Sequence, residues 1–124
     1  MVCTKDDVEV RVDRPVVGLV VVRVIGEVDL LGAPILRRRV EAALPGARAL
    51  VVDLSDTTFF GAAGLSVLVH TSALAERFRV RWALVCPSVI LRLVRITNLD
   101  RELPVCRDFG EAVLAATAPS AAFS

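Results

Sequence analysis

The sequence predicts a single α/β domain built around a mostly parallel, five-stranded sheet with about four helices. Two runs of aliphatic and β-branched residues, 19–25 and 49–54, have the length and composition of buried strands. A segment with apolar residues at helical spacing follows each run, and strands that alternate with helices pair in parallel. The 124 residues suffice for one domain, which we expect over 1–124 with its core at about 8–118.

Shorter signals complete the predicted sheet. Residues 8–12 alternate apolar and charged side chains, which predicts a half-exposed strand that pairs with 19–25 as a hairpin. Two later segments, 80–86 and 103–106, are also expected to be strands. The predicted order of elements is therefore ββαβαβαβα.

Residues that begin or end helices bound the helical segments. Pro34 suits a first helical turn, where its missing N–H does no harm. Ser88 is expected to cap a helix, and Asn98 to end that helix in the left-handed conformation. Asp108 and Glu111 have the spacing of a capping box. The predicted helices are 34–44, 62–78, 88–96 and 109–118.

Charge and hydropathy exclude several classes of protein. The chain has 15 basic and 14 acidic residues, so its net charge of +1 gives no electrostatic reason to expect a nucleic acid or a membrane surface as partner. No apolar stretch reaches the roughly 20 residues that span a bilayer, and the charged first residues are unlike a signal peptide. We therefore expect a cytoplasmic protein without membrane insertion, and a loose tail at 119–124.

The cysteines do not have the spacing of a metal site. Cys3, Cys86 and Cys106 form no CxxC motif, so we expect reduced, mostly buried thiols and no bound metal. An alternative is a redox pair between Cys86 and Cys106, which lie at the ends of two predicted strands. That pair requires neighbouring strands with Cα atoms within about 7 Å.

The chain also lacks a catalytic constellation. His70 is the only histidine and has no acidic or cysteine partner three or four residues away on its helix. Neither a Walker lysine motif nor GxGxxG is present, so we expect no nucleotide cofactor and no enzyme. Asp53 ends a buried strand, as a phospho-accepting aspartate of a receiver domain would. Such a domain also needs a late lysine, whereas Lys5 is the only lysine, so Asp53 is expected to bind nearby backbone N–H groups.

The segment that precedes the longest predicted helix is the most informative part of the chain. A helix that begins directly after a buried strand presents unpaired N–H groups and the positive end of its dipole. Here residues 61–64 (GAAG) carry only methyl groups and hydrogens. Gly64 costs roughly 1 kcal/mol relative to alanine in a helix, so it serves either close packing on the sheet or the approach of another protein. Of Phe59 and Phe60, we expect one in the core and one exposed as a recognition residue.

These segments resemble the STAS domain, the fold of bacterial anti-sigma factor antagonists. Residues 26–29 (GEVD) are similar to the family's G-E-[LIV]-D motif. Residues 51–55 (VVDLS) and 59–65 (FFGAAGL) are similar to D-L-S-x-[VL]-x-[FY]-[LIM]-D-[ST]-[SA]-G-L. The resemblance covers about residues 8–118, with both motifs at the separation that the family has.

The resemblance implies a binding protein that takes part in partner switching. An unphosphorylated antagonist of this family binds an anti-sigma factor, often a serine kinase, and the released sigma factor activates transcription. The kinase inactivates the antagonist by phosphorylating a Ser or Thr at the start of the long helix. The phosphate adds nearly two negative charges to the contact surface, which weakens binding.

This sequence departs from the family motif at the phosphoacceptor position. That position is Ala62, which has no hydroxyl, and the preceding acidic position is Gly61. Three explanations are open: a natural antagonist that is always active, an engineered replacement of a native serine, or phosphorylation of another hydroxyl. The nearby candidates are Thr57, Thr58 and Ser66.

The expected contact surface combines the loop at 29–34, the turn at 57–65 and the exposed side of the long helix. Asp29 either offers a carboxylate to a basic partner residue or caps the helix that follows it. The residues that we expect to bind the partner are Asp29, Thr58, Phe60, Gly61, Ala62, Ala63, Gly64 and Leu65.

Two other roles are compatible with the same fold. The first is a STAS regulatory subunit of an ABC-type lipid transporter, which needs no phosphorylation and therefore suits Ala62. The second is a sensor that binds a nucleotide or another small molecule in the crevice at the strand ends.

Overall fold

Each strand pairs with its neighbours in the sequence to form one six-stranded sheet. The computed structural model describes residues 2–5 and 8–118. The first two pairings are antiparallel and the other three are parallel, so the predicted α/β class with a mostly parallel sheet is confirmed. In order across the sheet, the strands are β1 (Val2–Lys5), β2 (Val8–Val16), β3 (Leu19–Val28), β4 (Ala49–Phe60), β5 (Arg81–Val85) and β6 (Val105–Cys106).

The five predicted strands occur in the predicted order, and β1 is an additional strand at the edge. Its four residues, VCTK, are too few to show an alternating pattern, and they lie within a charged N-terminal segment. β1 pairs antiparallel with β2, with Val2 opposite Arg11 and Lys5 opposite Val8. The sheet therefore extends one strand beyond the predicted hairpin.

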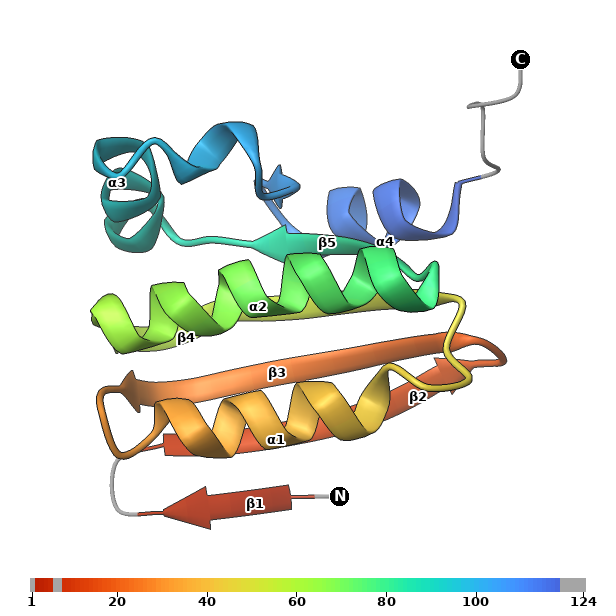
Figure 1. Cartoon of the computed structure of the whole chain (residues 1–124), viewed down its shortest axis with the longest axis horizontal. Coiled ribbons are helices and arrows are strands. Elements are labelled where there is room, and N and C mark those ends of the chain that lie inside the picture. Colours follow the sequence, from red (N-terminus) through yellow and green to blue (C-terminus); the bar gives the residue numbers. More distant parts are fainter. Residues whose placement is uncertain (1, 6–7, 119–124) are drawn as a thin grey trace.

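The helices cover the two faces of the sheet unequally. α1 and α2 lie side by side on one face, as Figure 1 shows, whereas α4 packs on the other face against β4 and β5. The helices are α1 (Ala33–Ala43), α2 (Ala62–Phe78), α3 (Ser88–Ile96), the short 3-10 helix η1 (Leu99–Arg101) and α4 (Phe109–Thr117).

Strand alternation divides the core into two clusters. On β3, Val20 and Val22 point toward α1 and α2, whereas Leu19 and Val21 belong to the smaller cluster under α4. Because both faces are covered there, consecutive residues of β3 are buried, which explains its nearly continuous apolar run. The part of the sheet that helices cover on both faces therefore precedes the carboxyl ends of β3 and β4. These strand ends position the candidate site.

β4 is longer than the sequence predicts. We expected it to end at Leu54 and to be followed by a turn, but it runs to Phe60 and stays paired with β3. The pairing register shifts between Asp53 and Asp56, which indicates an irregularity of the bulge type in β4. The polar residues at this irregularity are typical of a turn, which explains why the sequence predicted a turn there.

Most of the predicted helix signals are confirmed. Asn98 has φ of 60°, and the Asp108 carboxylate accepts a hydrogen bond from the backbone N–H of Glu111 at 2.8 Å. The Glu111 carboxylate in turn accepts one from the N–H of Arg107 at 2.9 Å, which completes the capping box. The prediction for Ser88 was wrong: α3 is capped by Pro87, and no side chain bonds to its first N–H groups.

No helix in the described part of the chain is both long enough and apolar enough to cross a bilayer. The loose tail expected at 119–124 lies outside the described residues.

Candidate functional site

The most distinctive site of the molecule is the start of α2. Gly61 caps this helix in an extended conformation, with φ of −91° and ψ of −173°, and no side chain bonds to the first turn. Its N–H donates to the Val28 carbonyl at 3.1 Å, which fixes the start of α2 against the end of β3. The first helical N–H groups therefore have neither an intrahelical partner nor a side-chain cap.

Gly64 is required for packing inside the protein. A Cβ atom at this position would lie 2.7 Å from Cζ of Phe60, closer than side-chain contacts allow. Gly64 is itself buried, so the structure supports close packing rather than the approach of a partner as the reason for this glycine. Gly61 differs, because a Cβ there would meet the Phe59 ring at 3.4 Å and the Val28 carbonyl oxygen at 3.9 Å, which are ordinary contact distances.

The two phenylalanines point in opposite directions. Phe60 is 5% exposed and belongs to the core, whereas Phe59 is 50% exposed. Consecutive side chains of a strand alternate between its faces, and β4 continues through both residues. Phe60 was therefore a wrong choice as a recognition residue, and Phe59 is the aromatic side chain that the surface presents.

Two leucines enlarge the apolar surface beside Phe59. Leu30 is 81% exposed and Leu31 64% exposed, both in the loop between β3 and α1. The loop lies next to the start of α2 because Gly61 is bonded to Val28. We call the group formed by Leu30, Leu31, Thr58, Phe59 and Ala62 the entry surface. Sequence reasoning missed both leucines, since two apolar residues in a short loop have no periodicity to mark them.

Asp29 shapes the loop that carries these leucines. Its Oδ1 accepts hydrogen bonds from the N–H groups of Leu31 at 3.0 Å and Gly32 at 2.9 Å. Gly32, and not Asp29, is the residue that caps α1. The side chain thus folds the loop so that the leucines point outward, which is close to the predicted capping role.

The other predicted contact residues divide by exposure. Thr58 and Ala62 are exposed, and Gly61 and Ala63 are half-buried, so these four line the accessible surface. Leu65 is 7% exposed and packs in the core below α2, so its side chain offers little area to a partner. Along α2, the exposed side continues from Ala62 in a row of small or apolar residues: Ser66, Val69 and Ala73.

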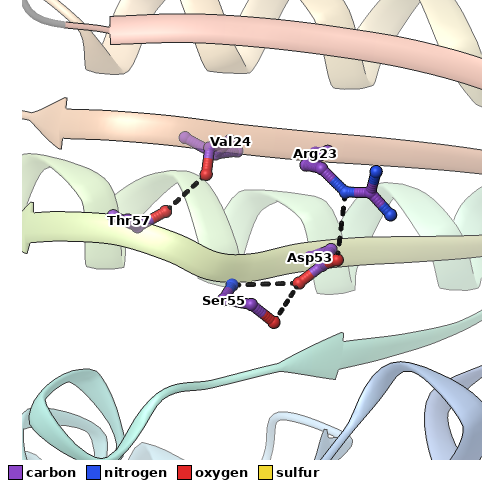
Figure 2. Close-up of polar contacts among 5 residues, drawn as sticks. All are labelled: Arg23, Val24, Asp53, Ser55 and Thr57. Carbon is purple, nitrogen blue, oxygen red and sulfur yellow. Dashed lines mark hydrogen bonds and ion pairs between the residues drawn. The ribbon is translucent and has the colours of Figure 1, made fainter.

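The three candidate hydroxyls differ in how easily they can be reached. Thr57 is 7% exposed, and its Oγ1 donates to the Val24 carbonyl at 2.9 Å, as Figure 2 shows. This hydroxyl is therefore part of the sheet and is a poor acceptor of phosphate. Thr58 is exposed on β4, and Ser66 is exposed on α2 one turn after Ala62. Ala62 has no oxygen to offer.

A family comparison identifies the domain. The family model of the STAS domain matches residues 7–112. The chain belongs to the STAS domain family. A comparison with functionally characterised protein sequences gives no significant match.

Solved structures with the same fold include known regulators. An anti-sigma factor antagonist from Mycobacterium paratuberculosis is 29% identical, with a TM-score of 0.81 over 91% of this chain and 97% of that one. SpoIIAA of Bacillus in its unphosphorylated form is 16% identical, with a TM-score of 0.67 over 82% of this chain and 91% of that one. The STAS fold here thus resembles that of anti-sigma factor antagonists.

The same fold also occurs within a membrane transporter. The murine Slc26a9 anion transporter matches with 20% identity and a TM-score of 0.72, over 86% of this chain and 19% of that chain. At this identity the likeness concerns the fold alone.

Asp53 stabilises the irregular part of β4 in this STAS domain. It is 4% exposed, and its Oδ1 accepts from Ser55 N at 2.9 Å and Ser55 Oγ at 2.6 Å. Its Oδ2 accepts from Arg23 Nε at 3.2 Å, and Figure 2 shows the carboxylate between the two partners. The bonds to Ser55 match the predicted backbone role. Both oxygens of this carboxylate therefore have hydrogen-bond partners within the sheet.

His70 links the two helices behind the entry surface. Its Nε2 lies 2.9 Å from Oε2 of Glu41 on α1, and Arg37 Nε donates to the same oxygen at 3.2 Å. Hydrogen bonds from His70 and then Arg37 lower the pKa of Glu41 below its ordinary value. The sequence does not indicate this partner, because Glu41 lies on another helix, 29 residues away along the chain.

The cysteines do not form the alternative redox pair in this structure. Cys86 and Cys106 are both free and buried, and they belong to the core clusters on opposite faces of the sheet. Burial raises the pKa of Cys86 to about 12 and also raises that of Cys106, so both thiols resist ionisation. Among the described residues no group of three potential ligands could hold a metal ion.

Proposed function

We propose that this STAS domain is an anti-sigma factor antagonist. It binds an anti-sigma factor of the serine-kinase type through the entry surface and thereby releases a sigma factor in the cytoplasm. The observation that carries the proposal is the exposure of three apolar side chains, Leu30, Leu31 and Phe59, near the start of α2, whose first turn no side chain caps. Exposed aromatic and aliphatic groups of this kind are typical of protein contacts.

The residues of the entry surface and the small residues next to it at the start of α2 have distinct tasks. Phe59 and the two leucines supply apolar area, while Gly61, Ala62 and Ala63 are small enough for a partner to reach the first N–H groups of α2. A polar or acidic partner group would find unpaired donors and a positive dipole there. The likeness to the antagonist from Mycobacterium paratuberculosis over nearly its whole length supports the same role.

Ala62 makes the proposed antagonist insensitive to the usual switch at this position. Phosphoryl transfer needs a hydroxyl, and the methyl group of Ala62 offers none. Thr58 and Ser66 are the accessible hydroxyls nearby, whereas Thr57 is buried and bonded. We therefore favour an antagonist that stays in its binding form, whether the alanine is native or engineered.

Binding of the anti-sigma factor from the native host tests the proposal by isothermal titration calorimetry. Phe59→Ala should weaken binding by about tenfold or more, because a half-exposed aromatic side chain acts as an anchor. Leu114→Ala is the matched control, since Leu114 is 72% exposed on α4, which contributes no residue to the entry surface. An equal loss of affinity in both variants, or no loss in either, would contradict the proposed surface.

A second candidate function is regulation of an ABC-type transporter by direct binding. The absence of a hydroxyl at Ala62 favours it, because such a subunit needs no phosphorylation. Purification of the tagged chain from its host distinguishes the two functions. An ATPase subunit of a transporter among the bound proteins would favour the second, and a sigma-regulating kinase the first.

A further inference from the structure

A separate pocket lies at the end of the sheet opposite to the entry surface. It has a volume of about 340 Å³ and opens between the β2–β3 hairpin, the first residues of β4 and β5, and the end of α4. Figure 1 shows this hairpin at one end of the sheet and α3 at the other. The volume falls in the lower part of the roughly 300–1,000 Å³ range of ligand pockets.

The walls of this pocket combine apolar groups with two arginines. Val16 and Val17 are 60% and 97% exposed at the hairpin and supply most of the apolar surface, whereas Leu19 and Ala116 are almost fully buried core residues that also line the pocket. The only charged lining residues are Arg48 and Arg81, so no described carboxylate lies in the wall. The six lining residues that carry the inference are Val16, Val17, Leu19, Arg48, Arg81 and Ala116.

The backbone places the two arginines next to each other. Ala49, which follows Arg48, is opposite Arg81 in the β4–β5 pairing, and the Arg81 N–H donates to the Arg48 carbonyl at 3.3 Å. The Arg48 side chain lies along the hairpin, because a Cβ at Gly18 would be 3.2 Å from its Cδ. Arg81 Nη1 donates to the Ala118 carbonyl, which holds that guanidinium at the pocket.

Neither arginine is neutralised within the described residues. The ion pairs there involve Arg11, Arg23, Arg37 and His70, and none includes Arg48 or Arg81. Both side chains bring positive charge to the wall of the same pocket, and a bound oxyanion would offset that charge. The fork of N–H donors on arginine fits the two oxygens of a carboxylate or phosphate.

The geometry points to a binding site for a small amphiphilic anion in this pocket. Arg48 and Arg81 bind its oxyanion head, and its apolar chain lies against Val16, Val17, Leu19 and Ala116. The site is independent of the entry surface, since it uses the amino ends of the parallel strands β4 and β5 and shares no residue with that surface. A bound anion would bridge the hairpin, two strand starts and α4.

Amide chemical shifts of the full chain test the site, with decanoate and octyl phosphate as probes for the two kinds of head group. Either probe should move the resonances of Val17, Gly18, Arg48 and Ala116. Decanol lacks the charge and acetate lacks the chain, so each should bind at least about tenfold more weakly. Arg48→Gln should weaken the binding of the charged probe by a similar factor, because the exposed Arg48 contributes to the head-group site without supporting the core.

Arg92→Gln provides the matched control, because Arg92 is exposed on α3 at the other end of the molecule. It should leave probe binding unchanged. The site is refuted if neither charged probe moves these resonances at millimolar concentration. It is equally refuted if decanol binds as well as decanoate, or if Arg48→Gln has no more effect than Arg92→Gln. None of these results bears on the anti-sigma factor, because the entry surface is not involved.

Discussion

Two adjacent phenylalanines determine the character of the proposed contact surface. Phe60 fills the space that Gly64 leaves open in the first turn of α2, and Phe59 is presented to solvent. The packing of Phe60 on Gly64 fixes where α2 begins, and thus where Ala62 lies. A residue buried for stability and a residue exposed for binding are therefore neighbours in the sequence.

Replacement of Gly64 tests the packing. Gly64→Ala should lower the free energy of unfolding by about 1–3 kcal/mol, because the added methyl group overlaps the Phe60 ring. Gly110→Ala is the control: Gly110 also lies in the first turn of a helix, α4, but it is exposed, and a Cβ there would meet Asp108 Oδ1 at an ordinary 3.4 Å. Urea unfolding measures both, and an equally small effect from the two variants would contradict the packing role.

Replacing the two phenylalanines by alanine should lower the free energy of unfolding by different amounts. Phe60→Ala removes a core side chain and should cost about 3–5 kcal/mol of unfolding free energy. Phe59→Ala should change stability by less than about 1 kcal/mol, since half of that side chain is already in water. Thermal and urea denaturation can compare the variants. A larger loss from Phe59→Ala would reverse the assignment.

At the scale of elements, the sequence predicted most of the fold. The bounds of α2 and the capping box of α4 were predictable because helical periodicity, Gly61, Asp108 and Glu111 act over a few residues. The extension of β4 was not, because pairing with β3 overrides the turn-like composition of residues 55–60. The entry surface was also predictable only in part. Ala62 was evident from the motif, whereas the exposed leucines of the β3–α1 loop were not.

The link between α1 and α2 predicts a dependence of stability on pH. The hydrogen bonds from His70 and Arg37 place the pKa of Glu41 below its ordinary value of 4.5. A lowered pKa stabilises the folded state above that value, and the contribution is lost as pH falls through the folded pKa. Glu41→Gln should remove this part of the acid sensitivity.

Unfolding by urea between neutral pH and pH about 3 measures the effect. Glu76→Gln is the control, because Glu76 is also an exposed glutamate within a helix, on α2, and takes part in none of the ion pairs among the described residues. An identical dependence of the unfolding free energy on pH in the two variants would show that the hydrogen bonds to Glu41 contribute nothing to the acid sensitivity of the fold.

At the scale of the whole molecule, unfolding exposes thiols that the folded core keeps protonated. Burial raises the pKa of Cys86 to about 12 from an ordinary value of 9.0, with a smaller contribution from Cys106. Above pH 9.0 the unfolded chain loses this proton while the folded chain retains it, so stability should fall as pH rises toward about 12.

The slope from this thiol should approach about 1.4 kcal/mol per pH unit. Cys86→Ala should make the fall shallower than in the unaltered protein when both are unfolded in urea at alkaline pH. An unchanged slope would mean that Cys86 ionises as readily in the folded state as in water.

The entry surface and the proposed anion pocket lie at opposite ends of the molecule. The central claim concerns the entry surface, through which the chain is proposed to bind an anti-sigma factor. The most direct test measures the affinity of the chain for the anti-sigma kinase of its host before and after incubation with magnesium and ATP, alongside Ala62→Ser. The unaltered chain should keep its affinity and gain no phosphoryl group. Ala62→Ser should be phosphorylated and lose affinity by about tenfold or more. Loss of affinity with phosphorylation of the unaltered chain, or no binding to the kinase at all, would contradict the account.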